Sequence, residues 1–145
     1  AIRHRTRVRR ALTVALKRAE SAHGRRVLAH CTKGARQGAS TTPRWFGVDV
    51  WLYNQAPIRI GSHVCISQGT FLTTGSHDAA TTMDLRVAPI VIEDGVWITS
   101  KCVVQMGVRI GRSALVTPLS VVPRSLAPGG VYGGNPCRFI RPRFA

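Results

Sequence analysis

Residues 60–77 read Ile60-Gly61-Ser62-His63-Val64-Cys65, Ile66-Ser67-Gln68-Gly69-Thr70-Phe71 and Leu72-Thr73-Thr74-Gly75-Ser76-His77, three hexads that each open with an aliphatic residue. After an interruption the six-residue repeat resumes, and hexads open at Ile92, Ile98, Val104, Ile110, Val116 and Val122. The fifth position is small or β-branched in all hexads but the last, and the residues are Val64, Thr70, Ser76, Val96, Cys102, Val108, Ala114, Ser120 and Leu126. A strict period of six therefore organises this part of the chain.

This period predicts an all-β fold, a single-stranded left-handed parallel β-helix built from hexapeptide repeats. Three hexads make one coil of about 18 residues, and stacked coils bury a continuous core. The opening residue of each hexad points inward, and the compact fifth residue fits the narrow corner. Sandwiches and barrels alternate with period two, and an amphipathic helix needs spacings of three and four, so neither fits. Gly61 and Gly111 are expected in turns between faces, where a residue without Cβ relieves backbone strain.

The repeat divides the chain into three parts. Residues 46–126 form the predicted β-helix, although the hexads before residue 60 are weaker. Residues 78–87 break the phase and are predicted to leave the prism as a loop, the kind of excursion on which binding sites are commonly built. Residues 1–45 form a basic N-terminal segment with some helical character over 8–22, and residues 127–145 form a C-terminal tail.

The charge is concentrated at the start of the chain. The net charge is +15, and residues 1–44 hold twelve of the 21 Lys and Arg residues against one acid, Glu20. Such a block could follow nucleic acid phosphates or anionic lipid headgroups, but it lacks the interleaved aromatic residues that stack on bases. We therefore expect a solvated arm or a loosely helical appendage, and no nucleic acid partner.

The four cysteines and the hydropathy of the chain bear on its compartment. Cys31, Cys65, Cys102 and Cys137 are widely spaced and form no zinc motif, which predicts reduced thiols. No apolar stretch is long enough to span a bilayer, and the Arg-rich start has no apolar core of a signal peptide. These features favour a cytoplasmic protein without a membrane span. An organelle transit peptide over residues 1–30 is the less favoured alternative.

His77 stands at the root of the predicted loop, at a coil corner. A neutral imidazole is a suitable base for taking a proton from a hydroxyl near neutral pH. A single histidine beside a loop is more often a surface or capping residue, so position alone does not assign a role. His63 occupies an ordinary position within a hexad and is expected to face solvent.

Further motifs accompany the hexads: Trp51-Leu52-Tyr53-Asn54, Ile66-Ser67-Gln68-Gly69, Thr74-Gly75-Ser76-His77-Asp78, Ala88-Pro89-Ile90-Val91-Ile92, Gly95-Val96-Trp97-Ile98 and Gly134-Asn135-Pro136. With these motifs the chain resembles the colanic-acid biosynthesis acetyltransferases, relatives of the maltose and galactoside acetyltransferases among the hexapeptide-repeat acyltransferases. The resemblance covers about residues 45–141.

The resemblance implies an acetyl-CoA-dependent O-acetyltransferase that acts on a sugar hydroxyl in exopolysaccharide biosynthesis, works as a homotrimer and needs no metal. In such an enzyme His77 is the base that deprotonates the hydroxyl, and both substrates bind together without an acyl-enzyme. Asn54 is the candidate for stabilising the oxyanion, with corner stabilisation as its alternative role. The residues matching those that contact CoA in the relatives are Trp97, Ser100, Pro118, Pro123, Arg124, Arg138 and Arg141. The arginines suit the phosphates of CoA, and a simple basic surface is the alternative.

The chain also departs from the family. Thr117-Pro118-Leu119 stands where relatives have a small-residue stretch that lets pantetheine approach the backbone, and Thr99 replaces a glycine. Because Pro118 removes an N–H donor and Leu119 adds bulk, an inactive hexapeptide-repeat scaffold or binding protein is the alternative function. A γ-carbonic-anhydrase-like metal enzyme needs three histidine ligands, and His63 with His77 does not supply them.

Overall fold

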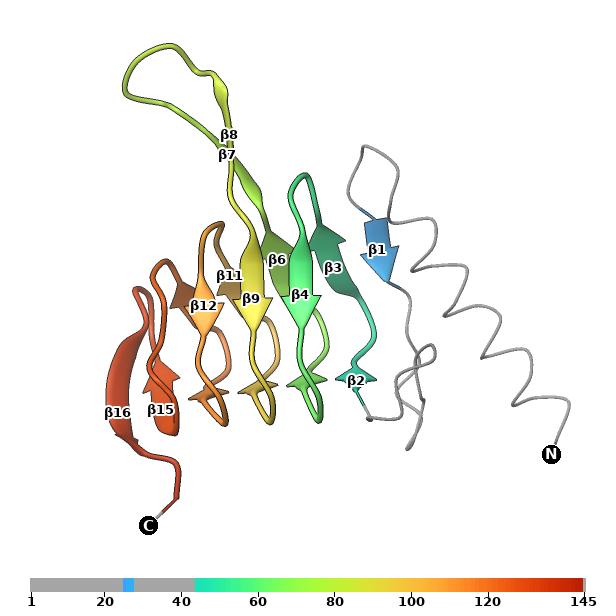
Figure 1. Cartoon of the computed structure of the whole chain (residues 1–145), viewed down its shortest axis with the longest axis vertical. Coiled ribbons are helices and arrows are strands. Elements are labelled where there is room, and N and C mark those ends of the chain that lie inside the picture. Colours follow the sequence, from blue (N-terminus) through green and yellow to red (C-terminus); the bar gives the residue numbers. More distant parts are fainter. Residues whose placement is uncertain (1–24, 28–43, 145) are drawn as a thin grey trace, which may run out of the picture.

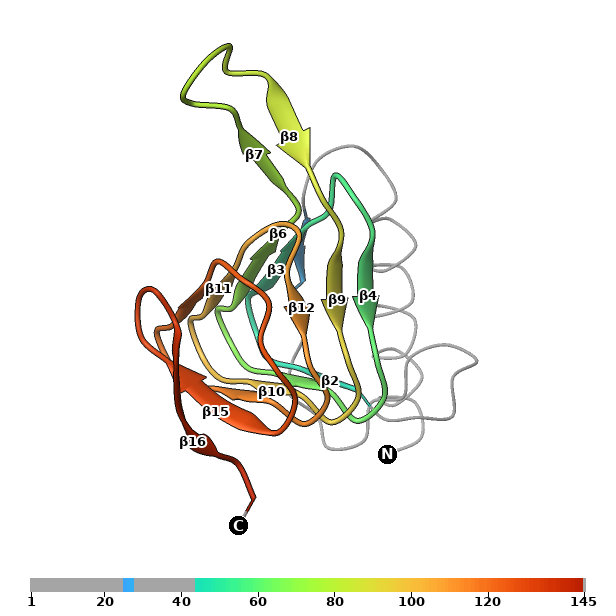
Figure 2. The same cartoon turned by 60° about the vertical axis from the view of Figure 1, so that its left-hand side comes forward.

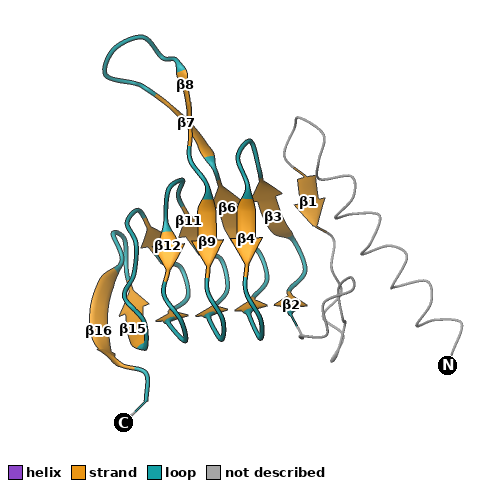
Figure 3. Ribbon diagram, viewed as in Figure 1, coloured by secondary structure: helices purple, strands orange, loops and turns teal. Residues whose placement is uncertain are grey.

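The chain winds into a triangular prism whose three faces are parallel β-sheets (Figure 1). The computed structural model describes residues 25–27 and 44–144, and regular secondary structure within these ranges is all β-strand (Figure 3). Face A contains β3 (Val50–Tyr53), β6 (Phe71–Thr73), β11 (Val103–Val104) and β14 (Val121–Val122). Face B contains β2 (Trp45–Phe46), β5 (Cys65–Ile66), β10 (Trp97–Ile98), β13 (Leu115–Val116) and β15 (Gly130–Gly133). Face C contains β4 (Ile58–Ile60), β9 (Ile90–Ile92) and β12 (Arg109–Ile110).

Successive coils stack in register along each face. On face B, Ile98 pairs in parallel with Ile66 on one side and with Val116 on the other. Backbone hydrogen bonds join the coils, as between the N–H of Cys65 and the carbonyl of Val96 at 2.9 Å. The predicted left-handed parallel β-helix is therefore confirmed. The predicted helical stretch over residues 8–22 lies outside the described residues.

The core consists of the inward aliphatic residues that the period of six predicts. The opening residues that are buried are Ile66, Leu72, Ile92, Ile98, Val104, Ile110, Val116 and Val122. Ile60 is half-buried because β4 is the edge strand of face C. Leu126 is wrongly predicted as a fifth-position residue, since it pairs with Ile110 and occupies the inward position of face C itself. The last corner is thus two residues shorter than the repeat requires, which explains why Leu126 breaks the compact-residue rule.

Three polar residues are fully buried at the corners, and each finds a hydrogen-bond partner. The hydroxyl of Thr70 donates to the carbonyl of Thr99 at 2.9 Å, and that of Ser120 donates to the carbonyl of Thr117 at 2.7 Å. Thr74 bonds to the preceding coil in the same way. Because a buried hydroxyl without a partner destabilises a fold, these bonds make compact polar residues acceptable where the hexads contain them.

Gly61 and Gly111 lie at corners as predicted, but the physical reason differs from the predicted one. Neither glycine has a positive φ angle. A Cβ on Gly61 would instead lie 2.4 Å from Oδ1 of Asp94, and one on Gly111 would lie 2.6 Å from the backbone N of Pro128. The left-handed conformation falls two residues later, as at His63 (φ 55°) and Ser113 (φ 56°). Close approach of the next coil, not conformational freedom, therefore requires these glycines.

The chain leaves the prism earlier than the repeat predicts. The hexad Leu72–His77 begins in β6, but Gly75–His77 forms β7, which pairs antiparallel with β8 (Leu85–Val87). Ser76 is consequently exposed and is not a corner residue. Figure 2 shows this hairpin projecting beyond the prism. The third face of that coil is supplied instead by β9, after the chain has returned.

Antiparallel strands flank the stack at two places that the hexad phase does not mark. β1 (Arg25–Val27) pairs with β3, so part of the basic N-terminal segment adds a strand to face A. β16 (Arg138–Pro142) pairs with β15 at the end of face B. There the ring of Phe139 meets Tyr132 edge-on, with the ring centroids 5.6 Å apart.

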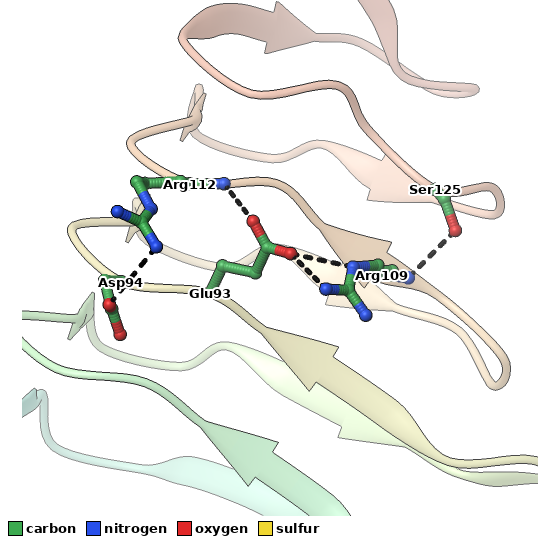
Figure 4. Close-up of polar contacts among 5 residues, drawn as sticks. All are labelled: Glu93, Asp94, Arg109, Arg112 and Ser125. Atoms are coloured by element: carbon green, nitrogen blue, oxygen red, sulfur yellow. Dashed lines mark hydrogen bonds and ion pairs between the residues drawn. The ribbon is translucent and has the colours of Figure 1, made fainter.

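A charge cluster ties two coils together on face C and its corner (Figure 4). Glu93 accepts hydrogen bonds from Nε of Arg109 and from the backbone N–H of Arg112, both at 2.7 Å. The Arg112 side chain also lies 3.9 Å from Asp94. The backbone bond from Arg112 and the guanidinium of Arg109 lower the pKa of Glu93 below its ordinary value of 4.5.

The substitution Glu93→Gln should lower the thermal unfolding midpoint at pH 7. Because the pKa of Glu93 is lower in the folded chain, its carboxylate contributes stability above the unfolded pKa and loses that contribution as pH falls through the folded value. The difference between variant and wild type should therefore shrink below pH 4.5. Melting curves at pH 7 and pH 3 measure it, with Asp78→Asn on the projecting hairpin as control. An unchanged difference at both pH values would contradict the assigned role of the charge.

Candidate functional site

The hairpin that carries His77 is anchored by a buried threonine at its root. The hydroxyl of Thr74 donates to the carbonyl of Tyr53 at 3.0 Å and accepts from the N–H of Ala56 at 2.9 Å. Its backbone N–H also donates to the carbonyl of Tyr53, and its carbonyl accepts from the N–H of Ala88, which directly follows β8. Both ends of the hairpin are thereby fixed to the first two coils, so the hairpin that carries His77 is firmly attached to the prism.

The hairpin pairs His77 with Leu85, Ser76 with Arg86 and Gly75 with Val87. Directly opposed residues of an antiparallel pair point to the same side. His77 therefore shares one side of the hairpin with the apolar Leu85 and Val87, and all three side chains are exposed.

The backbone of the turn determines the orientation and tautomer of the His77 ring. Nδ1 of His77 lies 2.8 Å from the carbonyl oxygen of Met83, a residue with a φ of 59°. A carbonyl oxygen only accepts, so Nδ1 carries the proton and donates it. In the neutral ring, Nε2 is then the unprotonated nitrogen that a general base requires. The carboxylate of Asp78 lies 4.0 Å from the guanidinium of Arg86.

Three predicted site residues share the corner between faces A and C with the hairpin. Asn54 is half-buried at this corner directly after β3. Pro123 and Arg124 stand at the same corner two coils beyond the hairpin, directly after β14. Arg124 is exposed, so its guanidinium is available to an anionic ligand.

The remaining predicted CoA residues lie elsewhere on the prism. Trp97 points outward on face B, 42% exposed, and its Nε1 donates to Oγ of Ser67 at 3.1 Å. Ser100 and Pro118 lie at the corner between faces B and A, where the N–H of Leu119 donates to the carbonyl of Ser100. Arg138 and Arg141 are exposed on β16. In one chain, these groups are thus separated from the corner that carries His77.

Two residues that sequence reasoning missed support this arrangement. Arg143 donates from Nη1 to the carbonyls of Gly95 at 2.8 Å and Ser113 at 3.0 Å, which fixes the C-terminal tail on the prism. The carbonyl of Met83 orients His77. Arg143 looks like any other tail arginine in the sequence, and a backbone carbonyl has no side-chain signature at all.

The cysteines of the described residues are free thiols, namely Cys65, Cys102 and Cys137. Burial raises the pKa of Cys102, and burial together with the nearby Cys102 raises the pKa of Cys137 to about 11. These two thiols are therefore poor nucleophiles near neutral pH. No group of three potential metal ligands occurs among residues 25–27 and 44–144. The same ranges contain no helix that is long and apolar enough to cross a membrane.

Comparison with known proteins places this geometry in a family. Over 100 residues, the chain is 42% identical to the colanic acid biosynthesis acetyltransferase WcaF of Escherichia coli (strain K12), covering 68% of this chain and 55% of that protein. The structure superposes on a hexapeptide-repeat containing acetyltransferase of Vibrio cholerae with a TM-score of 0.66 and 35% identity, covering 70% of this chain and 60% of that one. The chain belongs to the hexapeptide-repeat acetyltransferases.

Other comparisons within this acetyltransferase family agree. The galactoside O-acetyltransferase of Escherichia coli (strain K12) is 34% identical over 88 residues, which cover 58% of this chain and 43% of that enzyme. The structure of the Vibrio cholerae acetyltransferase complexed with acetyl coenzyme A is 27% identical, with a TM-score of 0.56, and covers 69% of this chain and 66% of that one. No protein-family model matches the sequence. The chain spans about half the length of the curated relatives it matches.

Proposed function

We propose that this protein transfers an acetyl group from acetyl-CoA to a sugar hydroxyl, in the synthesis of an exopolysaccharide. The observation that carries the proposal is that Nδ1 of the exposed His77 donates to the carbonyl of Met83, which leaves Nε2 of the neutral ring as the proton acceptor. Relatives named for colanic acid synthesis and galactoside acetylation support the sugar acceptor. The Vibrio cholerae relative complexed with acetyl coenzyme A supports the donor.

The reaction needs one proton acceptor and no covalent enzyme intermediate. Nε2 of His77 removes the proton from the sugar hydroxyl as its oxygen attacks the thioester carbonyl. The tetrahedral intermediate then collapses, the C–S bond breaks, and the imidazolium returns the proton to the departing thiolate. The products are the O-acetyl sugar and free CoA. Asn54 is our candidate donor to the oxyanion, from the same corner as the hairpin.

The separation of the site residues supports a homotrimer. His77 projects from the corner between faces A and C, whereas Trp97, Ser100 and Pro118 lie on face B and its corner with face A. An exposed hairpin side bearing Leu85 and Val87 suits contact with another copy of the chain. We propose that His77 of one copy acts on acetyl-CoA bound along face B of the next. The CoA-binding residues are then Trp97, Ser100, Pro118, Arg138 and Arg141 of the copy that holds acetyl-CoA, together with Pro123 and Arg124 at the His77 corner of the first copy.

A thiol-release assay with acetyl-CoA and a panel of acceptor sugars tests this function. We expect release of CoA that depends on the acceptor, and a particle of three chains by light scattering. If no sugar stimulates release and CoA causes no thermal shift, the protein is instead a scaffold. The Thr117-Pro118-Leu119 corner is the feature that favours this second function, because the exposed Leu119 adds bulk at a position where the resemblance implies a small residue.

Leu119→Gly should lower the KM for acetyl-CoA several-fold without loss of thermal stability. Leu119 is 70% exposed and has a φ of 61°, a conformation that costs an L-residue about 1 kcal/mol or more and that glycine adopts freely. His63→Gly, with a φ of 55° at the corner between faces C and B, relieves the same kind of strain away from Pro118 and is the matched control. A higher KM in the Leu119 variant would show that Leu119 contacts CoA favourably.

A further inference from the structure

Three aromatic side chains form a row on the outer side of face A. Trp51 on β3 is the register partner of Phe71 on β6, and Tyr53 follows Trp51 by two residues on the same side of the strand. The ring centroid of Phe71 lies 5.2 Å from that of Trp51 and 6.4 Å from that of Tyr53. Phe71 thus packs between the other two rings and holds both in place.

On face A, Trp51 and Phe71 belong to a column of outward side chains, one from each coil, that changes from aromatic to aliphatic along the prism. Beyond Phe71 it continues as Val103 and Val121, which are half-buried aliphatic residues. On the other side, Trp51 is the register partner of Arg26 on β1 and remains 43% exposed. The aromatic row is therefore confined to the first two coils, the coils from which the His77 hairpin departs.

The row is continuous with the hairpin that carries His77. A Cβ on Gly75 would lie 3.5 Å from Cε1 of Tyr53 and 3.0 Å from Oε1 of Gln55. Gly75 and His77 lie on the same side of β7, because side chains two residues apart on a strand share a side. The side of the hairpin that bears His77 therefore faces Tyr53 and Gln55 at its root.

Strand geometry gives the length of this surface. Two residues of a strand span about 7 Å, so Trp51 lies about 7 Å from Tyr53, and His77 lies about 7 Å from Gly75. Tyr53 and Gly75 are in contact between them. The path from Trp51 to His77 is thus longer than one sugar ring, and a monosaccharide held at His77 cannot reach Trp51.

We propose that Trp51, held by Phe71, is a distal subsite for a second or third sugar unit of the acceptor, which is therefore an oligosaccharide or glycan chain. This inference rests on the proposed function. The negative face of an aromatic ring attracts the weakly positive C–H groups on the flat side of a pyranose. The Tyr53 hydroxyl and the Gln55 amide, which bond to each other, lie between the subsite and the base and offer polar groups to sugar hydroxyls.

A second copy of the chain is the alternative occupant, and the chemistry of the row favours the sugar. Besides its rings, the surface presents the polar side chains of Tyr53, Gln55 and Thr73, and Gln55 is exposed. A hydrated ligand with many hydroxyl groups suits such a mixed surface better than an apolar protein contact does. The row also runs directly into the proposed acceptor site.

Kinetics with a graded acceptor series tests the subsite. The probes are glucose, galactose and fucose, each with its di-, tri- and tetrasaccharides, assayed by thiol release from acetyl-CoA. For wild type we expect kcat/KM to rise about tenfold or more from monosaccharide to trisaccharide. In Trp51→Ala this rise should disappear through a higher KM for the longer acceptors, while the monosaccharide reaction and the KM for acetyl-CoA stay unchanged. Val121→Ala, at the far end of the same column, should behave as wild type.

Binding measured without turnover separates this inference from the proposed function. Calorimetry should show that His77→Ala still binds the trisaccharide and that Trp51→Ala has lost this binding. If the trisaccharide binds through Trp51 but no sugar is acetylated, the subsite stands and the proposed function fails. Three results overturn the subsite: equal use of monosaccharide and trisaccharide by wild type, no binding of any oligosaccharide in the series, or a change of particle mass in Trp51→Ala, which would make the row a contact between copies.

Discussion

His77→Ala should lower kcat for acetyl transfer by about a hundredfold to ten-thousandfold, the usual contribution of a positioned general base. The side chain is exposed on a hairpin outside the core, so folding and acetyl-CoA affinity should not change. Steady-state thiol release measures kcat, and a thermal shift with CoA measures donor binding. Added imidazole should restore part of the activity, because it can occupy the space of the lost ring and accept the proton.

His63 offers a control for this substitution. It is an exposed histidine on another corner, where its φ of 55° would strain alanine, so His63→Asn is the matched change because asparagine tolerates this conformation. This variant should retain full activity. Acetyl transfer that survives intact in His77→Ala would remove His77 from the reaction.

Ile98→Ala should destabilise the folded chain by about 2–5 kcal/mol, the range measured when a large aliphatic core residue is truncated. Ile98 is fully buried in the third coil, between Ile66 and Val116 of the neighbouring coils. The regular stacking of short strands leaves little freedom for neighbouring side chains to move into the cavity. Urea unfolding at one fixed protein concentration measures the loss, since assembly would make the midpoint depend on concentration.

Val48→Ala is the matched control for the core substitution. Val48 is 40% exposed, so its truncation should change stability by no more than about 0.5 kcal/mol. A loss in Ile98→Ala as small as that of the control would mean that the neighbouring coils move to fill the cavity.

The fold could be predicted from the sequence because the six-residue period of a β-helix directly marks the positions that are buried. Aliphatic residues recur every six positions within each of the two blocks of hexads, and Ile66 in the first block and Ile110 in the second are both buried. The prediction was less accurate where the chain departs from the six-residue spacing. Leu126 comes two residues early, and the pairing of β7 with β8 depends on contacts between residues that show no alternating pattern.

The sequence predicted the site less completely than the fold. A resemblance to known acetyltransferases singled out His77, whereas the group that orients its ring is the carbonyl of Met83, which any residue would provide. The aromatic row was also hidden, because Trp51 and Phe71 are 20 positions apart and meet only when consecutive coils stack. Chemistry carried by the backbone, or by register between coils, requires the structure.

The reversed strand β16 caps one face of the stack. Every coil of a parallel β-helix offers the next one an open edge, so nothing in the repeat itself says where stacking should stop. By running antiparallel to β15, β16 occupies that edge on face B with a strand of the opposite direction. A further coil would find no parallel strand to continue there. On this face, β16 thus prevents the addition of another parallel coil.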